Sequence, residues 1–145
     1  MKKLFFIFMI AALFVACGDD FDDRSPQEQI DDYLEEMGLT AEVTSSGLNY
    51  IIENEGTGTT NPTLADTVTV NYRGTLLNGD VFDQNPNATF LLTGVIPGWQ
   101  EGIPLFRKGG SGKLLIPPSL GYGNFRVGPI PPNSVLVFDI ELIDF

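Results

Sequence analysis

Residues 95–102 have the sequence VIPGWQEG and contain Trp99, the only tryptophan of the chain. Pro97 suits the first position of a helix, because the N–H that proline lacks would have no intrahelical acceptor there. The helix cannot run far, because Pro104 lacks an N–H and its ring collides with the carbonyl of Gln100. We therefore predict a helix of about two turns at most around Trp99. On these residues alone, Trp99 is more often a core side chain than the floor of a binding site.

Elsewhere in the chain, apolar and polar residues alternate with the period of two that is typical of β-strands. Three apolar faces are predicted: Leu48, Tyr50 and Ile52; Val68, Val70 and Tyr72; and Leu136, Phe138, Ile140 and Leu142. Residues 113–116 predict another short strand, which ends before Pro117, and Asn78-Gly79 indicates a tight turn between two strands. These patterns predict an α+β domain in which half-buried antiparallel strands surround one short helix.

The first 16 residues have the features of a signal peptide, since two lysines precede thirteen apolar residues, too few to span a bilayer. The next residue is Cys17, and residues 13–17 resemble the lipobox of bacterial lipoproteins, in which the cysteine is diacylated and becomes the mature N-terminus. Phe14 departs from the leucine that is usual three positions before that cysteine. The resemblance predicts a stable lipid anchor on Cys17, because two acyl chains bind a membrane more firmly than one. The alternative is an ordinary secreted protein with a free cysteine.

Residues 17–25 are predicted to be an acidic tether. Residues 17–42 contain ten acidic residues and one basic residue, whereas residues 43–145 contain nine acidic and five basic ones. This charge argues against nucleic-acid binding and favours a tether that holds the domain away from anionic headgroups. The run GDDFDD after Cys17 also resembles export signals of some Bacteroidetes surface lipoproteins; the alternative is a solvated linker. A glycine directly after the cysteine favours the outer membrane, on its periplasmic face or at the cell surface, by analogy with lipoprotein sorting.

A short helix and linker are predicted at residues 26–42, before a domain that covers residues 43–145. Ser25-Pro26-Gln27-Glu28 is a capping-box pattern with proline at the first helical position. Ile30, Tyr33, Leu34 and Met37 then recur at helical spacing before Gly38. This apolar stripe can pack on the domain or on a second copy of the chain, and the sequence does not decide between the two.

The composition excludes several kinds of site. The chain has no histidine, and its one cysteine is at the predicted lipid anchor, which excludes Ser-His and Cys-His catalysis and the usual zinc sites. Residues 109–113 (GGSGK) resemble a phosphate-binding loop, but Leu114 stands where such a loop needs Ser or Thr, so a flexible turn is predicted. The acidic cluster at residues 19–23 lacks the glycine and the terminal glutamate of a calcium loop. We therefore expect neither a metal nor a cofactor.

Several segments, taken in order along the chain, resemble the FKBP-type peptidyl-prolyl cis-trans isomerases. They are residues 70–74 (VNYRG), 82–83 (FD), 95–99 (VIPGW), 121–123 (GYG), 130–132 (IPP) and 137–142 (VFDIEL). The resemblance extends from about Gly47 to Phe145, and its specificity lies in the combination. It implies an antiparallel sheet curled around a short helix. The chain departs from the family pattern at Ala88, at Pro104 and in the loop of residues 124–129.

The resemblance also implies a pocket between the sheet and the helix. Trp99 would form its floor, and its walls would be Tyr72, Phe82, Phe90, Val95, Ile96, Ile130 and Phe138. The Ile96 N–H and the Tyr122 hydroxyl would contact ligand carbonyls, while Asp83 would organise Tyr72. The expected catalytic residues are therefore Asp83, Tyr122 and Tyr72. The implied partners are proline-containing polypeptides and, by the same resemblance, macrolide-type inhibitors.

An apolar pocket suits rotation about an X–Pro bond, whose barrier is about 18–20 kcal/mol because the planar amide is stabilised by resonance. Such a pocket disfavours the planar ground state more than the twisted transition state, so no covalent step is needed. The leading hypothesis is a lipid-anchored isomerase that acts on exported or envelope proteins. A membrane-tethered peptide-binding chaperone with little or no turnover is the second, and a purely structural surface lipoprotein is the third.

Overall fold

The computed structural model describes residues 22–145, so the predicted signal peptide, Cys17 and residues 17–21 of the acidic tether lie outside the described residues. Its helices and strands are α1 (Pro26–Met37), β1 (Glu42–Val43), β2 (Asn49–Asn54), β3 (Thr67–Leu76), β4 (Val81–Leu91), α2 (Pro97–Gly102), β5 (Ser111–Ile116) and β6 (Leu136–Asp144). Short 3-10 helices cover Leu92–Gly94, Ile103–Leu105 and Pro118–Leu120. In the part described, no helix combines the length and the apolar character needed to cross a bilayer.

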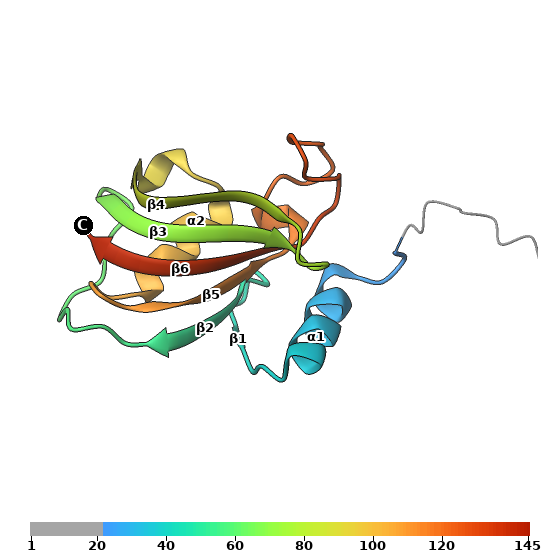
Figure 1. The fold of residues 1–145 in the computed structure, drawn as a ribbon, viewed down its shortest axis with the longest axis horizontal. Coiled ribbons are helices and arrows are strands. Elements are labelled where there is room, and N and C mark those ends of the chain that lie inside the picture. Colours follow the sequence, from blue (N-terminus) through green and yellow to red (C-terminus); the bar gives the residue numbers. More distant parts are fainter. Residues whose placement is uncertain (1–21) are drawn as a thin grey trace, which may run out of the picture.

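The strands form one six-stranded sheet in the order β1-β2-β5-β6-β3-β4, and every neighbouring pair is antiparallel. Figure 1 shows this sheet curving around α2. Successive side chains of a strand point to opposite faces. Leu114 and Ile116 of β5 accordingly join the main core with α2, whereas Leu115 joins a second core under α1. The predicted α+β class, an antiparallel sheet curled around a short helix, is confirmed.

The strand that follows α2 is longer than predicted. Ser111 pairs with Glu141, and Gly112 pairs with both Ile52 and Ile140, so these residues already belong to β5. The prediction of a flexible turn over residues 109–113 is therefore wrong beyond Gly110. Its glycines misled the prediction, because a glycine in a strand can also mark the close approach of a neighbouring backbone. Gly112 is such a case, since an added Cβ would collide with the Ile51 carbonyl.

Helix α2 lies very close to β5, and two glycines four positions apart make this approach possible. A Cβ added to Gly98 would lie 2.6 Å from the Ile116 side chain, and one added to Gly102 would lie 2.5 Å from the Leu114 side chain. Residues four apart lie on the same side of a helix, so this side of α2 must carry no side chains. As predicted, the helix is short, and Pro104 lies in the 3-10 turn that follows it.

Helix α1 matches its predicted bounds and packs on the face of the sheet opposite α2. The Ser25 side chain accepts from the Glu28 N–H, the Glu28 carboxylate accepts from the Ser25 N–H, and Gly38 ends the helix with φ of 64°. Ile30 and Leu34 are buried, in one core with Leu115, Val135 and Val137. The apolar stripe therefore packs on the domain of its own chain. Met37 was predicted within this stripe, but it is 55% exposed.

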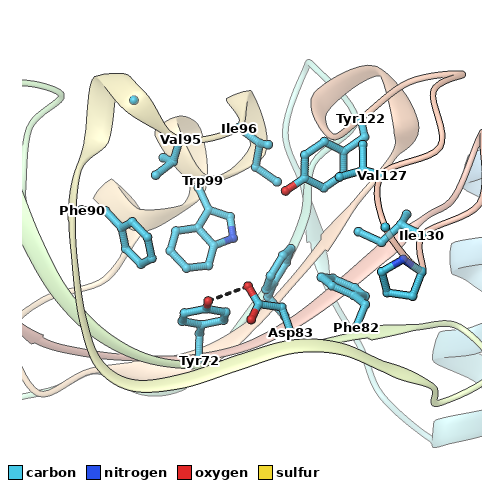
Figure 2. A pocket seen from close by; sticks show the side chains of 14 residues that line it. Tyr72, Phe82, Asp83, Phe90, Val95, Ile96, Trp99, Tyr122, Val127 and Ile130 are labelled. Atoms are coloured by element: carbon cyan, nitrogen blue, oxygen red, sulfur yellow. Dashed lines mark hydrogen bonds between the residues drawn. The ribbon is translucent and has the colours of Figure 1, made fainter.

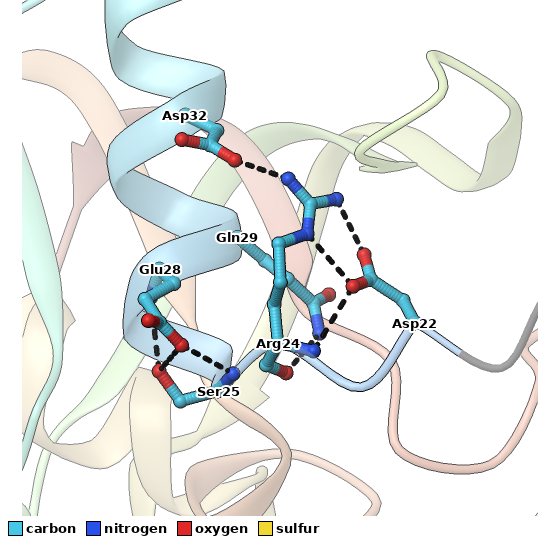
Figure 3. A network of polar contacts seen from close by, with 6 residues as sticks. All are labelled: Asp22, Arg24, Ser25, Glu28, Gln29 and Asp32. Carbon is cyan, nitrogen blue, oxygen red and sulfur yellow. Dashed lines mark hydrogen bonds and ion pairs between the residues drawn. The ribbon is translucent and has the colours of Figure 1, made fainter.

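Polar contacts fix the start of α1 (Figure 3). The Arg24 guanidinium pairs with both Asp22 and Asp32, and its hydrogen bonds hold the pKa of Asp22 below the ordinary value. Further along the helix, the side-chain amides of Gln27 and Asn49 bond to each other, which gives the fully buried Asn49 a polar partner. These contacts join residues 22–24 to α1, and α1 to the sheet.

The fit of α2 on β5 predicts that Gly98→Ala destabilises the domain. The added methyl group must displace Ile116, and overpacking of this kind costs about 1–3 kcal/mol. The gain in helix propensity offsets up to about 1 kcal/mol. Gly94→Ala is the matched control, because its Cβ would meet no atom within 4 Å. Urea unfolding should show a lower midpoint for Gly98→Ala and an unchanged one for Gly94→Ala; equal midpoints would contradict the close approach.

Candidate active site

A cavity of about 480 Å³ lies between the sheet and α2. Its lining contains every residue that the sequence analysis assigned to catalysis or substrate binding, and it also contains Gly94, Val127, Gly128 and Pro129. Figure 2 shows Tyr72 and Phe82 on one side of this cavity and Val95, Ile96 and Tyr122 on the other. The structure thus brings the predicted residues together, while their individual roles remain predictions.

Trp99 is held at the base of the cavity by the edges and faces of other aromatic rings. Its ring centroid lies 5.2 Å from that of Tyr72, 5.5 Å from Phe90 and 5.2 Å from Phe138, with interplanar angles of 80° to 88°. T-shaped contacts of this kind are favourable for aromatic pairs. Only 4% of Trp99 is exposed, and its buried Nε1–H has no hydrogen-bond partner among residues 22–145. The indole is therefore both part of the core and part of the cavity wall.

Gly74 leaves room for two aromatic rings that line the cavity. Phe82 and Phe138 meet edge to face, with centroids 5.4 Å apart. A Cβ on Gly74 would lie 2.5 Å from Phe82 and 2.9 Å from Phe138, so both rings occupy the space above this glycine. The sequence analysis quoted Gly74 in a motif but gave it no role. Its function depends on contacts between strands, for which a single sequence carries no signal.

The polar groups of the cavity are two tyrosines and one carboxylate. The Tyr72 hydroxyl donates to Asp83 Oδ2 over 2.7 Å. Burial and this hydrogen bond raise the pKa of Tyr72 to about 12. Burial, together with the charge of Asp83, also raises the pKa of Tyr122 above its ordinary value. Both hydroxyls therefore keep their protons at neutral pH. The Tyr72 O–H is already donated to Asp83, so Tyr122 is the tyrosine that can donate to a ligand.

The backbone of Ile96 offers a further donor. Ile96 directly precedes α2, and its carbonyl accepts from the N–H groups of Trp99 and Gln100 at 2.9 and 3.1 Å. Its own N–H has no acceptor within residues 22–145. One wall of the cavity therefore carries an N–H group that is free to donate to a carbonyl oxygen of a ligand.

One wall comes from residues 124–130, of which the sequence analysis named only Ile130 as a site residue. Val127 and Ile130 exchange two backbone hydrogen bonds of 3.1 and 2.9 Å, and Gly128 between them has φ of 53°. This small hairpin brings Val127, Gly128 and Pro129 to the cavity. Because these three residues directly precede Ile130 in the chain, their position was the only feature of the sequence that indicated a place in the cavity lining. Ala88, noted above as a departure from the family pattern, is buried and does not line the cavity.

The fold and the cavity agree with the family resemblance described under the sequence analysis, and comparison with known proteins identifies the family. Residues 58–143, more than half of the chain, match the model of the FKBP-type peptidyl-prolyl cis-trans isomerase family. The chain therefore belongs to the FKBP-type peptidyl-prolyl cis-trans isomerase family. It is 46% identical over 127 residues to the FKBP-type peptidyl-prolyl cis-trans isomerase FkpA of Escherichia coli K12, a match that covers 85% of this chain. It is 50% identical over 105 residues, or 70% of this chain, to FkpA of Buchnera aphidicola from Schizaphis graminum.

Solved structures give the same result. The crystal structure of FkpA from Escherichia coli has a TM-score of 0.74 and 44% identity, covering 82% of this chain and 58% of that one. A peptidyl-prolyl cis-trans isomerase from Pseudomonas syringae has a TM-score of 0.70 and 30% identity, covering 81% and 91% of the two chains. The two FkpA sequences are matched over only 46% and 42% of their own length, so the chain spans about half of these curated relatives.

The hydrogen bond between Tyr72 and Asp83 leads to a prediction about Tyr72→Phe. Loss of the hydroxyl should lower the free energy of unfolding by about 0.5–1.5 kcal/mol at neutral pH, as for a typical hydrogen bond. Because folding raises the pKa of Tyr72 from 10 to about 12, its contribution is fully present below pH 10 and is lost as the pH rises towards 12. Urea unfolding at pH 7, 9 and 11 should therefore show the difference between the two proteins shrinking at pH 11. A difference that is constant or grows with pH would contradict this assignment.

Proposed function

We propose that the protein catalyses cis–trans isomerisation of X–Pro bonds in exported or envelope proteins. One observation supports this most strongly: an apolar aromatic cavity with Trp99 at its base, a few hydrogen-bond donors and, within residues 22–145, no serine, cysteine, histidine or lysine in its lining. Rotation about an X–Pro bond breaks no covalent bond, so such a cavity contains all that the reaction needs. The family of the chain and its FKBP-type relatives give independent support.

In the proposed mechanism the proline ring lies on Trp99, among the surrounding aromatic side chains. The planar amide is polar, and twisting it removes the resonance and much of the charge separation. An apolar environment therefore opposes the planar ground state more than the twisted transition state, and each 1.36 kcal/mol of this difference gives about tenfold in rate. The Ile96 N–H and the Tyr122 hydroxyl bind carbonyls of the substrate, and Asp83 fixes the position of Tyr72.

We also propose that the cavity binds macrolide-type inhibitors. Its volume of about 480 Å³ lies within the range of about 300–1,000 Å³ that is typical of small-molecule sites. Its mainly apolar lining and its few donors have the composition expected of such a site.

We place the protein at the bacterial cell envelope, held by lipid on Cys17, in the outer membrane. The support is the sequence: an apolar leader, the lipobox-like residues 13–17 and the glycine after the cysteine. The described contacts are compatible with such an anchor, because α1 and its Arg24 contacts lie on the face of the sheet opposite the cavity.

A peptide-binding chaperone with little or no turnover is the second candidate. It is favoured by exposed apolar side chains in the loop beside the cavity, where Phe125 is 72% exposed and Val127 is 39% exposed. Such side chains can hold apolar segments of an unfolded chain without any need for isomerisation.

The isomerase proposal predicts that the purified full chain accelerates the cis–trans relaxation of an Ala-Pro tetrapeptide. Trp99→Leu should lower kcat/KM at least tenfold, or about 1.4 kcal/mol, because the proline ring loses the indole surface. Leu142→Val is the control for general destabilisation, because Leu142 is fully buried but does not line the cavity. A folded wild-type chain without acceleration would refute the proposal, and unfolding of Trp99→Leu would mean that Trp99 is a core residue only.

Asp83→Ala and Tyr122→Phe separate the two candidate functions. If both variants still suppress the aggregation of an unfolded client protein but have lost isomerisation, the protein has both functions. If the wild-type chain suppresses aggregation and never accelerates isomerisation, the chaperone hypothesis replaces the isomerase one.

The lipid anchor predicts that Cys17→Ser changes the location of the protein. The wild-type chain should partition into the detergent phase, and its mature N-terminal peptide should have the added mass of acyl chains. Cys17→Ser should instead appear in the aqueous fraction. Protease treatment of intact cells then distinguishes the cell surface from the periplasmic face, while equal partitioning of the two proteins would contradict lipidation.

A further inference from the structure

Gln100 makes a hydrogen bond that lies directly beside the cavity. Its Nε2 donates to the carbonyl oxygen of Val95 over 2.8 Å. Gln100 is on α2, next to Trp99, whereas Val95 and Ile96 form a wall of the cavity. The bond therefore joins the helix that carries the floor to the segment that forms this wall.

The acceptor of this bond belongs to the same peptide unit as the free N–H described above. The Val95 carbonyl and the Ile96 N–H share one planar peptide group, which is trans, so the two bonds point in opposite directions. Gln100 is the only residue within 22–145 that donates to the Val95 carbonyl. A bond that fixes the direction of this carbonyl also fixes the direction of the Ile96 N–H.

We propose that Gln100 is a positioning residue that orients the Val95–Ile96 peptide, so that the Ile96 N–H is presented to a substrate carbonyl. This inference rests on the proposed binding of X–Pro peptides in the cavity. Gln100 acts through the backbone, because it is not among the residues that line the cavity. Its hydrogen bond also polarises the shared peptide group, which strengthens the N–H as a donor.

The identity of the side chain is important for this role. Methionine has nearly the same shape as glutamine but no donor, so Gln100→Met removes only the hydrogen bond. Glutamate has the same shape with an acceptor in place of the donor, and as an anion it repels the Val95 carbonyl oxygen. The loss of substrate affinity should therefore increase from wild type to Gln100→Met to Gln100→Glu.

The experiment compares the full-length wild type with Gln100→Met, Gln100→Glu and the control Glu101→Gln. Glu101 is the next residue of α2, and its carboxylate accepts from the Ser46 hydroxyl at 2.6 and 2.8 Å, away from the cavity lining. For each protein, an Ala-Pro tetrapeptide is titrated against the fluorescence of Trp99 to obtain Kd. The values of KM, kcat and the unfolding midpoint are measured in parallel, and amide NMR follows the Ile96 N–H without peptide.

We expect Kd and KM to rise about threefold in Gln100→Met and about tenfold in Gln100→Glu, with kcat within twofold of wild type. The N–H contacts the substrate in both the ground and the transition state, so its loss acts mainly on KM. The Ile96 amide signal should shift in both variants, while Glu101→Gln should keep the wild-type Kd and Ile96 signal.

Wild-type Kd and KM in both Gln100 variants would overturn the inference, as would a fall in kcat that parallels a lower unfolding midpoint. If the wild type binds the peptide but does not accelerate isomerisation, the proposed function fails, and the order of the Kd values decides the role of Gln100. If the wild type binds no peptide, the Ile96 amide decides: an unshifted signal in both variants refutes the positioning role.

Discussion

The contact between α2 and β5 leaves no space for even one additional carbon at Gly98 or Gly102. This close approach sets how deep Trp99 lies, because the indole follows Gly98 directly on the helix. Tyr72, Phe90 and Phe138 can then meet the indole edge to face at about the distances that aromatic pairs prefer. On the opposite side of the rings, Gly74 provides the space that Phe82 and Phe138 require. Close packing between backbone and side chains thus determines the position of the aromatic rings that line the cavity.

The sheet separates this site from α1. Leu114 and Ile116 face α2 and the cavity core, whereas Leu115 between them packs under α1. The helix that follows the tether is therefore attached to the back of the sheet, and no residue of α1 lines the cavity. The two faces of one strand thus keep α1 away from the cavity.

Local sequence patterns predicted local structure well, since the bounds of α1 followed from its capping box and Gly38, and α2 followed from Pro97 and Pro104. The grouping of the site residues came from the family resemblance, since spacing alone favoured a core role for Trp99. The indole is almost fully buried, as the core role requires, and it also lines the cavity, while its role in binding stays a prediction. Contacts between distant or irregular segments were not predictable. The space above Gly74, the hairpin at Val127 and the bond from Gln100 to Val95 all depend on how folded elements meet, which no local pattern specifies.

The most direct test of the link between packing and activity is NMR exchange spectroscopy on one Ala-Pro peptide, with catalytic amounts of folded wild type and folded Gly98→Ala. Uncatalysed exchange takes about tens to hundreds of seconds. Wild type should bring cis–trans exchange of the peptide into the range of seconds or faster, and Gly98→Ala should slow it, because α2 and Trp99 must move away from β5. No acceleration by wild type, or equal acceleration by the two proteins, would show that the position of Trp99 does not govern the reaction.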